Sequence, residues 1–444
     1  MKNKGLFIVA AMLVCAQFTM SQQNADINQY RRSSLYTIII DDEGLMEKSK
    51  AEIIKNTFIE TPLPEKFNDH NLGIRAVKPK DFPVTSSDIA ATKDTKPNSE
   101  DGIKKDEKDE AYKLPAVLMK FFEKNHIAQD MIAKWYNKSN EFDSSTSSFF
   151  DMELIKQRGL YDASEFDKQM ADKSTRGIAM LADAGEDLIN NTFVVAVHFN
   201  YINKEEVGKA VSSTTSKAAN ALSGTRLGGI GRAASKAVQT TTDVAARGYM
   251  VKATAFLFQL DWTDEVNATF YQDYYNATDL SDFYESGKFR LKYIGSVSDW
   301  SDIQSTKYSK KPESELVKRA AVRSIDQVIA KLQKKYEPFR TKTPLSTTDP
   351  EVTAHIGMKE GVEEGDRFEV LEKNMDPETG KVTYKRIDTI KADKGKIWDN
   401  RYAADEEQTE DAAQGEGTVQ TITSTTFSGG SKKIYPGLLI RQIN

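Results

Sequence analysis

The sequence predicts an α+β protein: a central α/β domain whose three-or-more-stranded, mainly antiparallel sheet is covered by helices, followed by a small C-terminal all-β barrel. Two observations predict this order. Three long strand patterns lie between residues 192 and 297, and a long amphipathic helix follows them. Beyond residue 350 the pattern changes to short strands separated by turns, which a small barrel closes without leaving sheet edges.

Residues 1–21 have the organisation of a cleavable signal peptide. Lys2 and Lys4 form a basic start, and residues 6–14 are an apolar run shorter than a membrane-spanning helix requires. Small residues stand at Thr19 and Ser21, so we expect cleavage after Ser21 and a mature chain that begins at Gln22. The sequence therefore predicts an exported protein, located in the periplasm or associated with the outer membrane of a Gram-negative bacterium.

The single cysteine, Cys15, lies inside this leader. The sequence leaves open a lipoprotein signal with Cys15 as the lipidated residue, although Val14 stands where that signal has a small residue. In either case no thiol remains for a disulfide, for catalysis or for a metal. Loss of Lys2 and Lys4 also changes the formal net charge from −5 to about −7, which disfavours nucleic acid as a partner.

Residues 22–85 are predicted to be an N-terminal βα segment, with a strand over Ser34–Ile40 and a helix over Leu45–Asn56. The pattern leaves open whether this segment is a separate domain or the first βα unit of the next one. Residues 86–113 are dense in both charges and poor in large apolar side chains. Such a composition buries too little surface to offset its ordering entropy, so we expect a charged linker.

The central α/β domain is expected over residues 114–341. Helical patterns occupy its first part, and three strands follow, with an insertion rich in small residues over 205–247 between the first two strands. The helices are expected over residues 116–136, 149–157, 163–173 and 175–188, and the strands over Thr192–Tyr201, Met250–Trp262 and Lys288–Val297.

These strands differ in their patterns. The first places Phe193, Val195, Val197, Phe199 and Tyr201 on one face. The second is apolar on most of both faces, which is typical of a central strand. The third places Phe289, Leu291, Tyr293 and Val297 together on its inward face.

A helix is predicted over Glu313–Tyr336. Pro312 and acidic residues suit its start, and Lys334 and Lys335 suit its end, as the helix dipole favours. Its apolar stripe should cover the sheet and consists of Ala321, Ile325, Val328, Leu332 and Tyr336.

The C-terminal barrel is expected over residues 350–444, after a turn-rich seam at 342–349. A hairpin turn is predicted at 376–380, with a strand on either side of it. Further short strands are expected at 396–398, 418–423 and 438–443, and the acidic stretch 403–417 is expected to be a solvated loop.

The barrel opens with GMKEGVEEGDRFEV over residues 357–370, and Pro436-Gly437 marks its last turn. Together with the strands and the helix that carries VRSIDQVIAKL over 322–332, this order resembles envelope proteins related to the curli-secretion channel and to the flagellar T-ring protein. Their α/β domains share a fold with the lipoprotein activators of penicillin-binding proteins. The resemblance covers about residues 191–339 and 357–443. It implies a non-enzymatic envelope scaffold or adaptor and does not imply pore formation.

The insertion over 205–247 is the surface on which we expect a protein partner. From Gly208 onward it carries six basic residues and one acidic residue, with two weak small-residue helical faces. The alternatives are a solvated insertion that lies on its own domain and a peripheral contact with an anionic membrane surface. The candidate partner-contact residues are Arg226, Leu227, Ile230, Arg232 and Lys236.

An aromatic stretch among acidic residues and asparagines follows Trp262. Its tyrosines, Tyr271, Tyr274, Tyr275 and Tyr284, are candidates for stacking on a glycan. The competing interpretation, which we favour, is that these rings anchor a loop to the core.

No sequence pattern indicates catalysis or a cofactor. The four histidines lie in four separate segments without metal-ligand spacing, and no nucleophile elbow or zinc-protease phrase is present. We therefore expect no catalytic residue, cofactor or metal, although paired carboxylates keep a hydrolase as a lesser alternative. The leading hypothesis is a non-enzymatic scaffold or adaptor that binds envelope proteins, and the second is a glycan- or peptidoglycan-binding module.

Overall fold

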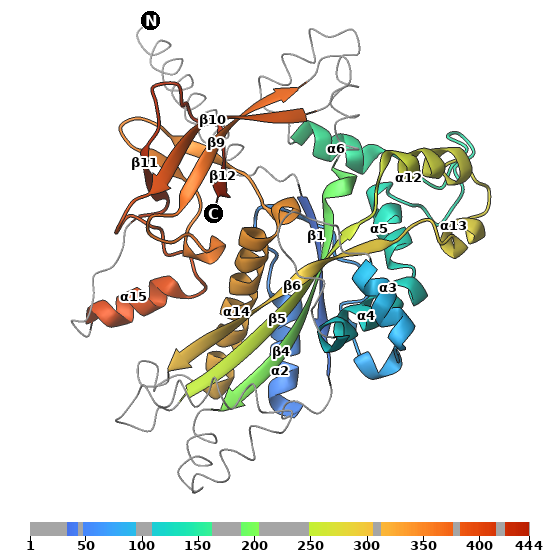
Figure 1. Cartoon of the computed structure of the whole chain (residues 1–444), viewed down its shortest axis with the longest axis horizontal. Helices are drawn as coiled ribbons and strands as arrows, with labels where there is room; N and C mark the ends of the chain where they lie inside the picture. Colours follow the sequence, from blue (N-terminus) through green and yellow to red (C-terminus); the bar gives the residue numbers. More distant parts are fainter. Residues whose placement is uncertain are drawn as a thin grey trace, which may run out of the picture.

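The computed structural model describes residues 33–42, 48–94, 109–161, 188–203, 248–304, 312–375, 382–413 and 422–443. These residues form an α/β domain built on a mixed sheet and a closed barrel near the C-terminus (Figure 1). The predicted α+β fold class is confirmed. Among the helices formed by these residues, none has the length and apolar character needed to cross a membrane.

The sheet of the α/β domain has the order β2-β1-β4-β5-β6, and β3 also pairs with β1. The β4–β5 and β5–β6 ladders are long and antiparallel, whereas β1 pairs in parallel with β2, β3 and β4. Strand β5 has a neighbour on each side, as its two-sided apolar pattern predicts. The strands are β1 (Ser33–Ile40), β2 (Phe67–Asp69), β3 (Ala76–Val77), β4 (Thr192–Asn203), β5 (Gly248–Leu260) and β6 (Leu291–Gln304).

The N-terminal strand β1 belongs to this sheet. Its residues from Ser34 to Ile40 pair with the start of β4, from Thr192 to His198, and all 8 of its residues are buried. The N-terminal βα segment is thus the first βα unit of the α/β domain. Its run SLYTIII lacks polar alternation because a strand with neighbours on both sides and helices on both faces meets no water.

Helices α2 (Lys48–Glu60) and α14 (Glu313–Lys335) cover one face of the sheet (Figure 1). The predicted stripe of α14 packs there against the predicted face of β4, from Phe193 to Phe199. The stripe and the face of β4 from Phe193 to Phe199 are confirmed, because the periods of 3.6 and 2 each place their apolar residues on one side. The side chain of Tyr201 lies outside the described part of the chain. The stripe residues in this core are Ala321, Ile325, Val328, Leu332 and Tyr336.

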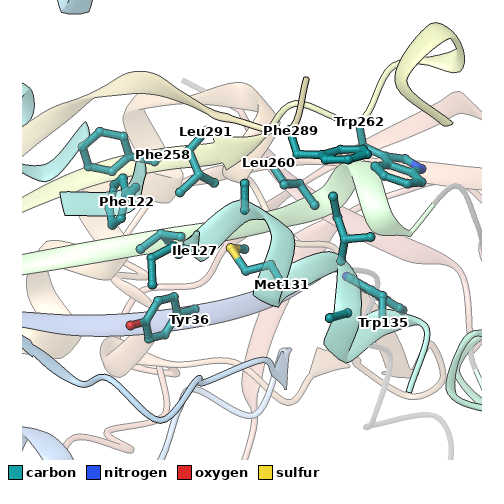
Figure 2. Close-up of a cluster of buried hydrophobic side chains, with 14 of the residues drawn as sticks. Tyr36, Phe122, Ile127, Met131, Trp135, Phe258, Leu260, Trp262, Phe289 and Leu291 are labelled. Carbon is teal, nitrogen blue, oxygen red and sulfur yellow. The ribbon is translucent and has the colours of Figure 1, made fainter. Parts of the chain in front are cut away.

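The other face is covered by α5 and the segments around it. Figure 2 shows Ile127, Met131 and Trp135 of α5 among the side chains of the sheet, with Tyr36 below them and Phe258 above. The helices are α4 (Asp109–Lys124), α5 (Ile127–Trp135), α6 (Glu153–Tyr161), α12 (Asp264–Thr269), η3 (Phe270–Tyr274) and α13 (Ser281–Glu285). Three further short turns are η1 (Pro79–Asp81), η2 (Ile189–Asn191) and η4 (Glu337–Phe339).

The helix predicted over 116–136 is divided in two. His126 adopts a left-handed conformation with φ of 51°, which ends α4 and lets α5 start in a new direction. The helices expected over 163–173 and 175–188 fall on residues 162–187, outside the described residues.

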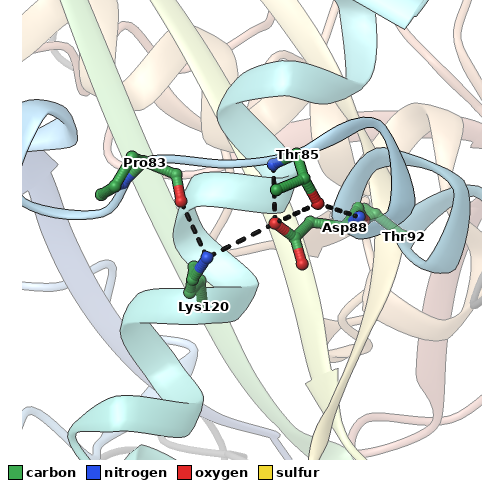
Figure 3. Close-up of polar contacts among 5 residues, drawn as sticks. All are labelled: Pro83, Thr85, Asp88, Thr92 and Lys120. Carbon is green, nitrogen blue, oxygen red and sulfur yellow. Dashed lines mark hydrogen bonds and ion pairs between the residues drawn. The ribbon is translucent and has the colours of Figure 1, made fainter.

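Part of the predicted charged linker is helical. Ser86–Asp94 forms α3, and α4 already begins at Asp109. A capping box starts α3: Thr85 N donates to Asp88 Oδ2 at 2.7 Å, and Asp88 N donates to Thr85 Oγ1 at 3.3 Å (Figure 3). Lys120 Nζ of α4 donates to Pro83 O at 2.8 Å and to Asp88 Oδ2 at 3.4 Å. The expectation of a charged linker is wrong for residues 86–94 and 109–113. Composition alone does not show that a helix is capped or that it packs on a neighbouring helix.

Strand β6 contains a β-bulge that the sequence analysis missed. Leu291 and Tyr293 lie in the core beneath α5, as predicted, but Val297 packs on the opposite face with α14. The ladder with β5 pairs Tyr293 and Gly295 with consecutive residues, so Ile294 has no partner in β5. One extra residue reverses the alternation beyond it, so the predicted inward face for Val297 is wrong.

The closed barrel has the strand order β10-β11-β8-β7-β12-β9, and the predicted C-terminal barrel is confirmed. Its core includes Leu345, Val370, Ile390, Phe427 and Ile440. The strands are β7 (Thr343–Thr347), β8 (Val352–Ala354), β9 (Arg367–Met375), β10 (Val382–Ala392), β11 (Thr425–Gly429) and β12 (Leu439–Ile443).

Two boundaries of the barrel differ from the expectations. The seam expected at 342–349 contains β7, so the barrel begins at Thr343. The loop expected at 403–417 instead forms α15 (Ala404–Ala413), because alanine and glutamate favour a helix and Arg319 of α14 binds Glu406 within it. The strand expected at 396–398 is a single bridge between Gly357 and Trp398. The strand expected at 418–423 falls mostly on residues 414–421, outside the described residues, and β11 begins at Thr425.

Candidate functional site

A polar cleft lies where the α/β domain meets the barrel. Its volume is about 260 Å³, slightly below the roughly 300–1,000 Å³ of drug-sized ligand sites. Glu65 and Lys66, just before β2, line it from the α/β domain. The barrel side is lined by His355, Lys359, Glu360, residues 398–401 and Asp405. Figure 1 shows α14 between the sheet and the barrel, so both domains position this cleft.

The barrel wall of the cleft is a tight turn, η5 (Met358–Glu360). Gly357 N donates to Glu360 Oε2 at 2.7 Å, and Met358 N donates to Trp398 O at 2.9 Å. A β-carbon at position 357 would lie 2.2 Å from the Trp398 carbonyl oxygen, so only glycine allows this approach. The turn is therefore fixed against the segment that carries Trp398.

Four polar side chains of the wall are occupied by neighbouring protein groups. Asn400 Nδ2 donates to Glu360 Oε2 at 2.9 Å, and Asn400 Oδ1 accepts from Lys359 N at 2.8 Å. Arg401 donates from Nε and Nη2 to the two oxygens of Asp399, at 2.8 and 2.7 Å. This bidentate geometry is a strong form of ion pair. These groups give the cleft its shape and hold its loop in one conformation.

The charges at the base of the cleft influence one another. Burial lowers the pKa of Lys66, and the nearby carboxylate of Glu360 opposes that shift. Burial of Glu360 alone would raise its pKa, but Lys66, Asn400 and the Gly357 N–H outweigh it and hold that pKa below the usual value. Behind them, burial raises the pKa of Asp326 on α14 to about 7, with Lys359 opposing the shift and Glu360 adding to it.

Lys66 and Lys359 are the two lysines of the lining, which also holds the carboxylates of Glu65 and Asp405. Both side chains are half-buried, and neither ammonium forms a hydrogen bond or ion pair with another residue in the described ranges. Lys66 comes from the α/β domain and Lys359 from the barrel. The cleft thus brings together two cations from distant parts of the sequence.

An aromatic pair forms another part of the lining. The rings of Trp398 and His355 lie 4.4 Å apart between centroids, tilted by 45°. The Trp398 backbone N–H donates to Thr425 Oγ1 at 3.1 Å, which fixes the residue to the barrel. Met358 and Tyr402, each next to a lining residue, are large hydrophobic side chains exposed by 37% and 36%. The surface therefore combines apolar contact area with charge.

Two carboxylates of the cleft are engaged by protein donors. Glu360 and Asp399 are both held by protein donors, which disfavours either as a general base. Within the described ranges no group of three or more histidine, aspartate or glutamate side chains could hold a metal ion.

The predicted partner-contact residues cannot be compared with this cleft. Arg226, Leu227, Ile230, Arg232 and Lys236 lie in 204–247, outside the described residues. The predicted cleavage position, Ser21 and Gln22, also lies outside them.

The four candidate glycan-stacking tyrosines, Tyr271, Tyr274, Tyr275 and Tyr284, pack partly buried against the core that contains Phe150, Phe270 and Phe283. Tyr274 Oη donates to Ser286 Oγ at 3.1 Å. In Figure 1 the helices that carry them lie on the side of the sheet opposite to the barrel. This packing favours the anchoring interpretation, and the structure does not bring these rings to the cleft.

The histidines remain separate, as their sequence positions predict. His70 is fully buried, with Nε2 2.9 Å from Met131 O, and burial together with Arg158 holds its pKa well below the ordinary value. His198 lies at the end of the parallel β1–β4 pair, with Nε2 3.7 Å from Asp42. Only His355 lines the cleft.

Sequence reasoning missed Lys66, Glu360 and Trp398 as site residues. Gly357 with a glutamate three residues later could have indicated a locked turn, in the manner of a capping box. Nothing in the sequence indicates that Lys66 approaches this turn, because the approach depends on how the two domains dock.

Comparison with known proteins does not assign the chain to a family. No protein-family model matches the chain, and no curated protein is detectably similar to it in sequence.

Proposed function

We propose that this chain is a non-enzymatic exported envelope protein that acts as a scaffold or adaptor for protein partners in the periplasm or at the outer membrane. The observation that carries the proposal is the junction cleft, with Trp398 in its lining and Met358 and Tyr402 exposed beside it. Tryptophan, tyrosine and methionine are enriched in protein–protein interfaces, and the first two dominate their energetic hot spots.

The rigidity of the junction supports this role. Lys334 of α14 lies 3.4 Å from Asp366 of the barrel, and Glu337 lies 3.2 Å from Arg441 of β12. Arg319 of α14 also binds Glu406 of α15. Contacts from α14 and from η4 directly after it to three parts of the barrel domain hold the cleft in one shape, and a preorganised surface loses less entropy on binding.

A photo-crosslinking experiment tests the binding function. A photoreactive phenylalanine analogue placed at Tyr402, beside the cleft, should give discrete protein adducts in intact cells. The same analogue at Tyr435, exposed by 53% and not part of the cleft lining, is the matched control. Absence of adducts at Tyr402, or identical adducts at both positions, would contradict the proposal.

The proposed export rests on residues 1–21 and has its own test. Intact-mass measurement of the chain from cell fractions should show a protein that begins at Gln22 in the periplasmic or outer-membrane fraction. A lipidated Cys15 would instead add the mass of acyl chains to a longer polypeptide. Full-length material in the cytosol would contradict export.

A glycan- or peptidoglycan-binding module is the second candidate, and the half-exposed ring of Trp398 favours it, because such rings stack on sugars. The engagement of Asn400, Asp399 and Arg401 by protein groups counts against it. Co-sedimentation with purified peptidoglycan, abolished by Trp398→Ala and unaffected by Tyr435→Ala, would establish this alternative.

A further inference from the structure

We propose that the junction cleft binds a carboxylate-bearing peptide segment, in which Lys66 and Lys359 receive an acidic side chain and Trp398 packs against a neighbouring aromatic or apolar one. This inference rests on the proposed function and specifies the chemistry of the partner.

The two lysines of the cleft are the first evidence for an acidic ligand. The lining holds four carboxylates, Glu65, Glu360, Asp399 and Asp405, beside its cations. Glu360 and Asp399 are engaged by Asn400 and Arg401, and Glu360 and Glu65 act on Lys66 electrostatically without a direct contact. Lys66 and Lys359 make no hydrogen bond or ion pair to any other residue that the structure describes. A half-buried ammonium without a direct partner gains more from an incoming carboxylate than an exposed one, because water screens the pair less.

The Lys66 environment supports this step. Burial is the main cause that lowers its pKa, and the nearby carboxylates of Glu360 and Glu65 offset that shift only in part. A carboxylate from a ligand would supply the missing compensation and would raise that pKa again.

The size of the cleft and the apolar surface beside it favour an acidic peptide over a small free acid. A volume of about 260 Å³ accommodates one or two side chains. The exposed side chains of Met358 and Tyr402 extend the apolar surface beyond the lining. A peptide that continues past the cleft covers this surface, whereas a free acid or a single sugar acid does not.

Binding of a defined probe tests the inference. The probe is a fluorescently labelled acetyl-Leu-Glu-Phe-Glu-Leu-amide, titrated by anisotropy with the mature chain. The matched probe, with glutamine in place of both glutamates, should bind roughly tenfold more weakly, because it lacks charge-assisted hydrogen bonds. Sodium chloride should weaken the acidic probe more than the neutral one.

Variants locate the binding. Lys66→Met and Lys359→Met should each weaken the acidic probe roughly tenfold and leave the glutamine probe unchanged. Lys432→Met, which removes an exposed barrel lysine outside the cleft lining, is the matched control. Unchanged thermal unfolding of the lysine variants verifies that they fold, and Lys66→Arg should restore most of the affinity.

Four results would overturn the inference. Equal binding of the acidic and glutamine probes would show that carboxylate is not recognised. Loss of binding in Lys432→Met equal to that in Lys66→Met would show non-specific attraction. Competition by glucuronic acid as strong as that by the peptide would identify a sugar acid as the occupant. Persistent adducts at Tyr402 without probe binding would refute this inference and leave the scaffold proposal standing.

Discussion

The side chain of Tyr336 occupies the space beside Gly295 where any other residue would place its β-carbon. A β-carbon at Gly295 would lie 2.1 Å from the Tyr336 hydroxyl oxygen, and that hydroxyl donates to Ser296 O at 3.1 Å. The bulge of β6 and the end of α14 therefore pack closely against each other. Because α14 also contacts the barrel, this fit connects the sheet to the junction.

Gly295→Ala should destabilise the α/β domain by about 2 kcal/mol, because the new methyl group can be accommodated only by moving the Tyr336 ring and the bulge. The free energy of unfolding in urea measures this. Gly287→Ala is the matched control, since a β-carbon there meets nothing within 4 Å. Equal effects of the two substitutions would show that the close approach to Tyr336 is unimportant.

Thr85→Ala should loosen α3, because it removes the acceptor of the Asp88 N–H and the hydroxyl that donates to the Asp88 carboxylate. The expected cost is about 1 kcal/mol, typical of a lost N-cap. Amide hydrogen exchange over 86–94 should become faster. Ser87→Ala, in the same turn but outside the capping pair, should leave that exchange unchanged. Similar protection in both variants would contradict the capping role.

The pKa of Asp88 gives this cap a pH dependence. Hydrogen bonds from Thr85 lower the pKa of Asp88 in the folded state. A lowered carboxyl pKa contributes stability above the unfolded-state value and loses it as the pH falls through the folded one. Protection of α3 should therefore decrease in acid, and Asp88→Asn should show weaker protection at neutral pH with less dependence on acid.

Asp326→Asn should stabilise the protein increasingly as the pH rises. Burial raises the pKa of Asp326 to about 7. At a pH between the pKa of this aspartate in the unfolded chain and 7, the unfolded chain has therefore lost the proton that the native protein still holds. This lowers native stability as the pH rises through that window and leaves a constant cost above it. The stability difference between variant and parent should grow by roughly 1–3 kcal/mol from pH 4 to pH 8.

Urea unfolding at several pH values measures this difference, and Asp273→Asn, at an exposed position, is the control. A difference between the Asp326 variant and the parent that stays constant with pH would contradict the raised pKa.

Arg319→Met should release α15 from α14. Arg319 is 2% exposed and donates to Glu315 Oε1 at 3.0 Å and to Glu406. Both glutamates can reach solvent when the arginine is removed, so the expected global cost is only about 1–2 kcal/mol. Faster amide exchange over 404–409 should report the release, and Lys318→Met should not change it. Unaltered exchange in the Arg319 variant would show that other contacts hold α15.

The sequence predicts best those helices and strands whose apolar residues repeat regularly over many positions. The stripe of α14 and the alternating face of β4 repeat over several turns or pairs, so their burial follows from local geometry. The hairpin strands and the barrel class followed from turns and short apolar runs. The errors arose where one residue changes a pattern: the bulge at Ile294, the left-handed His126 and the cap at Thr85.

The sequence by itself determined the amphipathic helix over a sheet and the small C-terminal barrel, and it predicts a leader over residues 1–21 that contains the single cysteine. Only the tertiary structure decided that β1 joins the central sheet and that Lys66 meets Lys359, Glu360 and Trp398 in one cleft. Periodicity reports which side of an element is buried. It carries no information about which distant element lies on that side, because docking depends on surfaces assembled from many segments.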